Sequence, residues 1–536
     1  MKANHYDRIG AIFFFIGVIL LLFSWHFSYP IYLTAPDELT FDQFHPSTWP
    51  GITLTLLGLF LTGYYSEKKS IKVICSAFIP ITLYVYSFYF SYLLSADSGN
   101  VKSMFEIFHK VGIDSSVIPY FQYPTYFTLN EITNQILGID SNSIAALFFA
   151  LYGILLGAFL FLFLFKKTRD DQFQIAFLAI PLYFITIFFY INYQWVPQTF
   201  ALVLFFLLLL TIDREGNQYK LFSFIIFIPF VFTHAFIPVI FLLFFGLYTY
   251  KKRSFFKFFI LMCCIYVTVL IYYTTYYLPV IIDIFKETFN GFGGEYTSKI
   301  AISLKETTGI FDQIFSFINR IRIPLTFIVL SLGFVISFVK KKLDFLIIML
   351  IIAGGFYLTI GLFFSILGLR ALQIVVISLV LGIGFYAIKW RKQTLIFVIV
   401  LLLLSIAGPM RNSYNQTNFL LNEEENACRF LATTMPFGVQ HNIALDQVDW
   451  GYFTNIDKYI NGRSSLAIRP GTQEFYLIFH PFMKENNYVI YNSNLVKEIK
   501  NFGVMSDNNT IFSKTTALNN KLYQCGKTSI LTGLQT

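Results

Sequence analysis

Apolar runs of membrane-spanning length recur through the first four hundred residues and leave few folds open to this chain. A transmembrane helix needs about 20 predominantly apolar residues. With 56% hydrophobic residues, 13% charged residues and a mean hydropathy of +0.63, the chain is too apolar for a soluble protein. The sequence therefore predicts an α-helical polytopic membrane protein. The predicted spans are Ile12–Ser28, Gly51–Tyr65, Val73–Leu94, Ile144–Phe165, Phe173–Tyr190, Gln198–Ile212, Phe255–Leu278, Ile323–Val339, Leu343–Phe363, Ile374–Ile388 and Thr394–Ala407, with a longer run at Leu221–Tyr250.

Short basic clusters between these runs, such as Lys340–Lys342, indicate the topology. Loops rich in Lys and Arg stay cytoplasmic, so the net charge of +9 indicates contact with anionic lipid and not nucleic-acid binding. If every cluster is cytoplasmic, an even number of spans must separate consecutive clusters. Leu221–Tyr250 must then be two short spans that meet near Thr233-His234. We expect about 13 spans, a cytoplasmic N-terminus and an extracytoplasmic C-terminus, in the plasma membrane of an archaeon or a bacterium.

The external segments differ in character from the spans. Val101–Val111 and Ile302–Ile321 show apolar residues at helical spacing, which predicts interfacial helices in two long external loops. Residues 410–536 are polar and Asn-rich, with short alternating stretches. We expect a transmembrane domain over residues 1–409 and a small external α/β domain over residues 410–536. A disulfide between Cys428 and Cys525 is open to such a tail if it lies outside.

An acidic pair, Asp37-Glu38, stands in P-D-E-L-T-F-D-Q-F-H directly after the first span. A carboxylate at an external cavity mouth can act as a general base or hold a divalent cation. The alternative is a solvated loop that happens to be acidic. Asp42 and His45 complete the cluster, and Asp97 ends the third span, where a helix end or an Asx turn is its structural alternative.

Other candidates for substrate binding lie at the predicted outer ends of the spans. His234 occupies the turn of the broken span, with hydrogen-bonded structure as its alternative role. Arg370 is the only charge in a very short external turn and suits a phosphate; a snorkelling Arg is the alternative. The stretch Tyr193-Gln194-Trp195 is most simply an aromatic belt, with contact to a sugar or an isoprenoid as the alternative. Arg320 and Arg322 could equally be interfacial anchors.

The pattern resembles the GT-C superfamily of membrane glycosyltransferases, among them the protein O-mannosyltransferases and the aminoarabinose transferases. These families carry an acidic pair in the first external loop, which Asp37-Glu38-Leu39-Thr40-Phe41 matches, and Tyr123-Pro124-Thr125-Tyr126 resembles the second external loop of many members. The resemblance implies a polyprenyl-phosphate sugar donor and inversion at the anomeric carbon. It implies Asp37 as catalytic base with Glu38 assisting, and Arg370 as the cation for the lipid phosphate. The chain departs from the mannosyltransferases in lacking their inserted luminal domain.

We therefore expect a glycosyltransferase that acts on an external glycan, lipid or protein, with Asp37, Glu38 and Asp97 as its catalytic residues. Arg370, His234, Asp42, His45, Tyr123 and Gln194 are the predicted substrate-binding residues. No cofactor is certain, and if Mg²⁺ or Mn²⁺ takes part, Asp37 and Asp97 are its expected ligands. The spans hold almost no ionisable residues, which weighs against transport. A flippase or transporter of lipid-linked saccharides and a polysaccharide polymerase or ligase remain the alternatives.

Overall fold

The computed structural model describes most of the apolar part of the chain and short pieces of the tail. The described residues are 3–29, 44–89, 96–113, 119–168, 173–186, 195–212, 214, 216–271, 310–363, 368–407, 422–434, 442–444, 453, 466–468, 487–491, 520–525 and 528–532.

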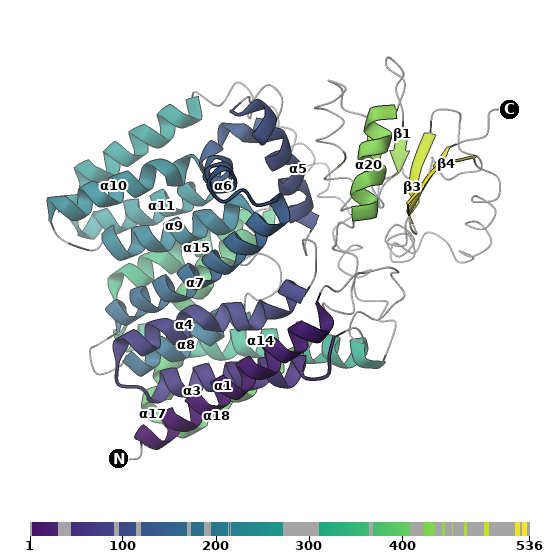
Figure 1. Cartoon of the computed structure of the whole chain (residues 1–536). Helices are drawn as coiled ribbons and strands as arrows, with labels where there is room; N and C mark the ends of the chain where they lie inside the picture. Colours follow the sequence, from purple (N-terminus) through teal and green to yellow (C-terminus); the bar gives the residue numbers. More distant parts are fainter. Residues whose placement is uncertain are drawn as a thin grey trace.

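The described part of the chain before residue 408 is a bundle of apolar helices (Figure 1). Six of them have the length and composition to cross a membrane: His5–Ser28, Lys69–Tyr89, Ser141–Lys167, Arg253–Ile271, Ile321–Val339 and Leu372–Lys389. Shorter apolar helices accompany them at Gln174–Thr186, Pro197–Ile212, Asn217–Val231, Ile237–Lys251 and Phe345–Thr359. The prediction of a helical membrane protein is therefore confirmed.

The helices run roughly alongside one another in two groups (Figure 1). The first group contains α1 (Ala3–Ser28), α3 (Thr48–Tyr65), α4 (Lys69–Tyr84), α8 (Phe173–Thr186), α14 (Ile310–Val339), α17 (Ile383–Lys389) and α18 (Arg391–Ser405). The second contains α7 (Ser141–Lys167), α9 (Pro197–Ile212), α10 (Asn217–Val231), α11 (Ile237–Lys251) and α15 (Phe345–Phe363). Helix α16 (Gly368–Leu379) packs on α15 and continues through a 3₁₀ turn, Val380–Gly382, into α17.

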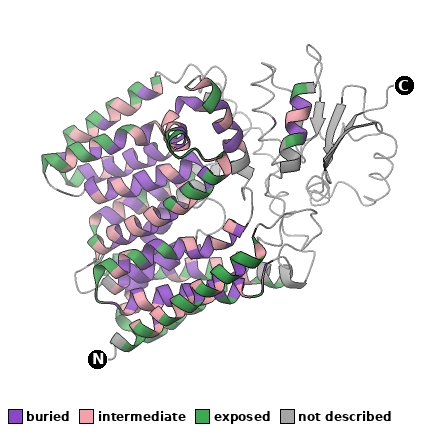
Figure 2. Ribbon diagram, viewed as in Figure 1, coloured by how far each residue is buried: buried purple, intermediate pink, exposed green. Residues whose placement is uncertain are grey.

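Aromatic and aliphatic side chains fill the space between the helices, and apolar residues also cover the outside. Buried residues concentrate in the middle of the bundle (Figure 2). On α1, Phe15, Ile19 and Leu22 are exposed on the outer face. A soluble protein rarely exposes such a continuous apolar surface, whereas lipid hydrocarbon accommodates it. The exposed faces therefore agree with a bundle embedded in a membrane.

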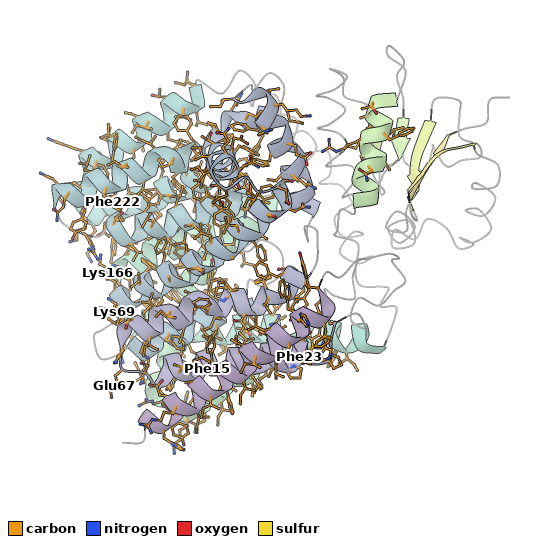
Figure 3. The ribbon with its side chains drawn as sticks, in the orientation of Figure 1. Phe15, Phe23, Glu67, Lys69, Lys166 and Phe222 are labelled. Atoms are coloured by element: carbon orange, nitrogen blue, oxygen red, sulfur yellow. The ribbon has the colours of Figure 1, made fainter. Side chains whose placement is uncertain are left out.

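The basic clusters lie together at one end of the bundle. Lys69 stands over the ring of Phe165, with its Nζ 4.3 Å from the ring centre, and Lys167 pairs with Asp344 at 3.4 Å. The Lys251 Nζ lies 4.4 Å from the centre of the Phe345 ring. Figure 3 shows Lys69 and Lys166 at this same end. Residues far apart in sequence thus share one end, which the parity of the predicted spans requires.

The long run Leu221–Tyr250 forms two helices, as predicted. Helix α10 ends at Val231 and α11 begins at Ile237. The rings of Phe227 and Phe241 pack 6.0 Å apart, so the two helices fold back on each other. The intervening turn contains Thr233, whose hydroxyl donates to the Pro229 carbonyl oxygen at 2.6 Å. This side-chain bond replaces part of the backbone bonding that ends with α10.

The expected interfacial helices differ from the observed ones. Helix α5 (Ala96–Val111) forms as predicted, but Phe105 and Phe108 are buried, so this helix packs into the protein. The predicted helix ending at Ile321 and the predicted span from Ile323 are one continuous helix, α14. Pro324 lies inside it. The boundary was placed wrongly because a proline inside a helix can be tolerated when neighbouring helices support the backbone, and α14 packs on α8, α17 and α18.

The described tail residues form one helix and five short strands. Helix α20 (Asn422–Thr434) packs against a sheet with strand order β2-β1-β3-β5-β4. The strands are β1 (Asn442–Ala444), β2 (Leu466–Ile468), β3 (Asn487–Tyr491), β4 (Asn520–Cys525) and β5 (Thr528–Thr532). β1 pairs in parallel with β2 and β3, whereas β5 is antiparallel to β3 and β4. The helix also reaches the bundle, because Arg429 pairs with Glu106 of α5.

Candidate functional site

The segment between α1 and α3 is closed at its base by hydrogen bonds between residues of α1 and residues at the start of α3. The backbone N–H of His45 donates to the Ser28 hydroxyl at 2.8 Å, and the Ser47 hydroxyl donates to the Leu20 carbonyl oxygen at 3.2 Å. The hydroxyls of Ser24 and Thr48 also contact each other. Asp37, Glu38 and Asp42 lie outside the described residues. Their loop nevertheless leaves and re-enters the bundle at two adjacent points, which we call the neck.

Away from the neck, helices α1 and α3 also approach each other closely. A Cβ atom at Gly58 would lie 2.3 Å from the backbone nitrogen of Phe14, so only glycine fits there. Tyr89, at the end of the 3₁₀ turn Val85–Tyr89 that follows α4, donates its hydroxyl hydrogen to the Leu21 carbonyl oxygen at 3.0 Å. Its ring also packs on Phe44, with ring centres 5.3 Å apart. The end of α4 is therefore part of the neck.

His45 serves the neck through its backbone and its ring. Its Nδ1 lies 2.9 Å from the Ser47 hydroxyl, and the ring packs against Phe23 and Phe27. These contacts give His45 a structural function at the start of α3.

Tyr123 and His234 lie in two segments that are joined by a backbone hydrogen bond. Helix α6 (Pro124–Leu137) begins against the α10–α11 turn, where the Thr125 backbone N–H donates to the Phe232 carbonyl oxygen at 3.2 Å. Tyr123 is buried just before α6, and His234 is buried within the turn. The His234 Nδ1 accepts a hydrogen bond from the Phe236 N–H at 3.1 Å. This contact supports the structural alternative for His234.

The remaining candidates are located only by their backbone or not at all. Asp97 is the second residue of α5 and Arg370 the third residue of α16, and nothing of their side chains is described. Gln194 lies outside the described residues. The predicted metal ligands cannot be placed either, because the structure does not describe the side chains of Asp37 and Asp97. Among the described side chains, no group of three His, Cys, Asp or Glu residues could hold a metal ion.

Trp195 is buried, and its interpretation as an aromatic-belt residue is wrong. Its side chain is 1% exposed, and its indole N–H donates to the Asn130 Oδ1 at 2.8 Å. The Asn130 amide in turn donates to the Tyr126 carbonyl oxygen at 2.7 Å. This arrangement links α6 to the segment before α9. A buried Trp satisfies its single donor in this way, and the neighbouring residues in the sequence give no sign of it.

A second polar contact holds α5 and α6 together. The His109 Nδ1 lies 2.8 Å from the Glu131 Oε1, which also accepts a hydrogen bond from the Gln135 amide at 2.8 Å. The other carboxylate oxygen of Glu131 is buried and accepts no hydrogen bond from the described residues. The sequence analysis missed this cluster because its members come from two helices whose packing only the tertiary structure shows.

Arg322 is the most informative residue whose role the sequence left open. It is 1% exposed, so it is not an interfacial anchor. Eighteen positions separate it from Lys340 at the basic end, and at 1.5 Å per residue this places it about 27 Å away along α14. That distance is close to the thickness of the hydrocarbon core. Arg322 interacts electrostatically with Tyr84, the last residue of α4.

The geometry thus places a buried guanidinium and the neck of the acidic loop on neighbouring elements. A buried cation needs an anionic or strongly polar counterpart. A phosphate and a carboxylate are both suitable partners for a guanidinium. No known protein-family profile matches this sequence, and no functionally characterised protein shows significant similarity to it.

Proposed function

We propose that this chain is a membrane glycosyltransferase of the GT-C kind. It would transfer a sugar from a polyprenyl-phosphate donor to an extracytoplasmic glycan, lipid or protein. The observation that carries the proposal is the position of Arg322, which is buried about one membrane thickness from the basic end and beside α4. Arg322 interacts with Tyr84 at the end of α4, and the 3₁₀ turn that follows α4 reaches Tyr89 at the neck, from which the acidic segment departs.

Each group has a distinct part in the proposed reaction. The Asp37 carboxylate accepts the proton of the acceptor hydroxyl, and Glu38 assists it. The acceptor oxygen forms a bond to the anomeric carbon as the bond from that carbon to the phosphate oxygen breaks, so the configuration inverts. The polyprenyl phosphate that leaves gains negative charge. Arg322 joins Arg370 as a candidate to stabilise that charge, since a fixed cation in a water-poor site acts strongly.

The proposal includes an orientation and a division of the chain. The basic end would face the cytoplasm, in keeping with the preference of Lys and Arg for that side. The neck, the start of α16 and the tail would then be extracytoplasmic. In this arrangement, residues 1–409 form the catalytic bundle, and residues 410–536 form an external domain that rests on α5 through the ion pair of Arg429 with Glu106.

Activity assays with the purified full-length chain test the proposal. The protein is incubated with a panel of labelled polyprenyl-phosphate sugars, and transfer or donor hydrolysis is scored. We expect turnover of at least one donor and loss of turnover in Asp37→Asn. Glu67→Gln is the matched control, because Glu67 is exposed at the opposite end of the bundle. Normal turnover in Asp37→Asn would refute the assignment of the catalytic base.

A liposome assay separates this function from transport. If the chain is a flippase, labelled lipid-linked saccharide should move between the two leaflets of reconstituted vesicles without chemical change. The Asp37→Asn variant should then move it as fast as wild type. The transferase predicts chemical conversion on one face instead. Flipping without conversion would therefore overturn the proposed function.

A further inference from the structure

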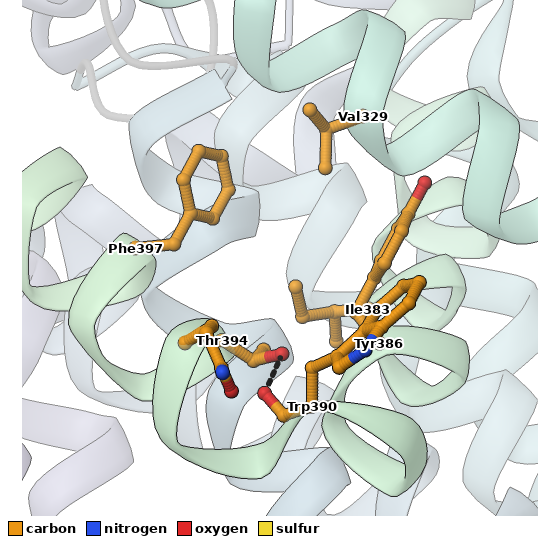
Figure 4. Close-up of a pocket in the computed structure, with 7 residues that line it drawn as sticks. Val329, Ile383, Tyr386, Trp390, Thr394 and Phe397 are labelled. Atoms are coloured by element: carbon orange, nitrogen blue, oxygen red, sulfur yellow. Dashed lines mark hydrogen bonds between the residues drawn. The ribbon is translucent and has the colours of Figure 1, made fainter.

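An open apolar cavity lies at the end of the bundle opposite the neck. It has a volume of about 390 Å³ and opens between α14, α17 and α18 (Figure 4). Its walls are mainly apolar and are formed by Val329, Ile383, Tyr386, Trp390, Gln393, Thr394 and Phe397. We call it the basal groove. Its volume falls within the range of small-ligand pockets, about 300–1,000 Å³.

Glycine contacts and a tight helix connection explain why the groove exists. A Cβ atom at Gly382 would lie 2.2 Å from the Leu330 carbonyl oxygen, so α14 touches the turn before α17 backbone to backbone. Helix α18 begins at Arg391, directly after Trp390. The rings of Tyr386 and Trp390 stack with their centres 6.2 Å apart and form one wall. The cavity lies between α14 and this wall, where the side chains of α14, α17 and α18 leave space unfilled.

The surface around the groove is suited to hydrocarbon. Ile328 and Leu332 on α14 and Ile396 and Val400 on α18 are all exposed. In a membrane these side chains contact lipid tails. Inside the groove, the hydroxyl of Thr394 is engaged because it donates to the Trp390 carbonyl oxygen at 2.9 Å. The groove therefore offers an apolar lining that is continuous with the lipid-facing surface.

The mouth of the groove carries positive charge. The Lys389 Nζ lies 4.6 Å from the centre of the Trp390 ring, and Lys392 is exposed in the first turn of α18. Between residues 380 and 400 the sequence contains no Asp or Glu. Arg391 is directed to a neighbouring helix, where its Nε donates to the Tyr64 hydroxyl at 3.1 Å. Two cations thus flank an apolar cavity.

We propose that the basal groove binds an anionic phospholipid. One acyl chain occupies the cavity along α14 and α18, and the phosphate lies between Lys389 and Lys392. Trp390 and Tyr386 suit the boundary between chain and headgroup, because aromatic residues with a polar edge favour that level of a bilayer. The first turn of α18 adds the positive end of a helix dipole to the two side-chain charges. This site depends only on embedding of the bundle in lipid and not on the proposed transfer reaction.

Native mass spectrometry of the full-length protein tests this site. The protein is held in micelles that contain equal amounts of phosphatidylglycerol and phosphatidylcholine, and the bound lipids are counted. We expect one retained phosphatidylglycerol in wild type. The variant Lys389→Gln/Lys392→Gln should weaken its retention about 30-fold, a factor of about five for each charge near an anionic headgroup. Lys252→Gln, in a different basic cluster, is the matched control and should retain the lipid.

A second variant tests the acyl chain. Val329→Trp fills the groove and should displace the lipid, whereas Ile328→Trp, on the exposed neighbouring position of α14, should not. Soluble glycerol phosphate should fail to compete, because it lacks the chain. Equal lipid retention by Val329→Trp and wild type would overturn the proposal. Unchanged preference in the charge variant, or full competition by glycerol phosphate, would do the same.

Discussion

The Tyr89 hydroxyl donates a hydrogen bond of 3.0 Å to the Leu21 carbonyl oxygen, although the two residues are 68 positions apart. The bond joins the 3₁₀ turn after α4 to α1, seven residues before α1 ends at Ser28. Leu21 is buried, so water does not compete for the contact. The base of the acidic loop is consequently held by three elements, α1, α3 and the turn after α4.

Tyr89→Phe should loosen the neck. The substitution removes the donor and keeps the ring, so the expected loss of stability is about 1 kcal/mol, the net contribution of a typical hydrogen bond. Thermal unfolding of the purified protein measures it. Tyr250→Phe is the control because Tyr250 is highly exposed, and its unfolding temperature should match wild type. If both variants unfold like wild type, the bond does not stabilise the neck.

Substitution of Arg322 should separate a phosphate-binding role from a structural one. If Arg322 holds the leaving phosphate, Arg322→Met should lower transfer about 10²-fold or more, as removal of a charge-stabilising donor does. Arg322→Lys should keep part of the activity, because it retains charge but not the guanidinium fork.

Arg253→Met, at the exposed basic end, is the control for that series. The measurement is kcat/KM with the identified donor, together with the unfolding temperature of each variant. A loss of stability in Arg322→Met with normal transfer by the folded fraction would contradict the phosphate role.

Two helical glycines should respond in opposite ways to alanine. In Gly382→Ala the new Cβ would lie 2.2 Å from the Leu330 carbonyl oxygen, which is backbone and cannot move easily. The expected cost is about 1–3 kcal/mol, as for other overpacked sites. Gly355→Ala meets no atom within 4 Å and should be neutral or stabilising by about 0.5–1 kcal/mol. Denaturation of both variants in one detergent compares them, and equal stabilities would contradict the helix contact.

Exchange of the charges at Glu106 and Arg429 should test the contact of the tail with α5. The pair is partly exposed, so each single reversal, Glu106→Arg or Arg429→Glu, should cost less than about 1 kcal/mol. The double variant should recover most of the loss. Limited proteolysis at the junction of bundle and tail measures the effect. Double-variant cleavage that is faster than in both single variants would show that the ion pair does not hold the tail.

Much of the helical architecture could be predicted because bilayer and charge rules act on local sequence. The basic clusters lie at one end, and the run Leu221–Tyr250 breaks between Val231 and Ile237, near the predicted position. The break was predictable because charge parity requires it and two prolines flank it. The continuity of α14 was not predictable, because its amphipathic first part and its apolar second part have different local patterns and were assigned to separate helices.

The polar contacts inside the bundle were not predictable. The sequence favours an aromatic-belt position for Trp195, whereas in the structure its indole nitrogen lies 2.8 Å from the Asn130 Oδ1 on another element. The sequence around Arg322 is compatible with an interfacial anchor, because no neighbouring residue indicates that other helices bury this side chain. Glu131 and His109 meet only when α5 and α6 pack. Each of these contacts joins residues that are 18 or more positions apart, which local patterns do not relate.

The sequence by itself determined that this protein is a membrane-embedded helical bundle with its basic clusters on one side and an acidic loop after the first span. Those properties follow from hydrophobic length and charge, which each segment carries independently of the others. Only the tertiary structure decided which polar side chains are buried and what they contact. Burial of Arg322 and closure of the neck by Tyr89 arise from packing between distant helices, where the cost of leaving a polar group unsatisfied selects one arrangement.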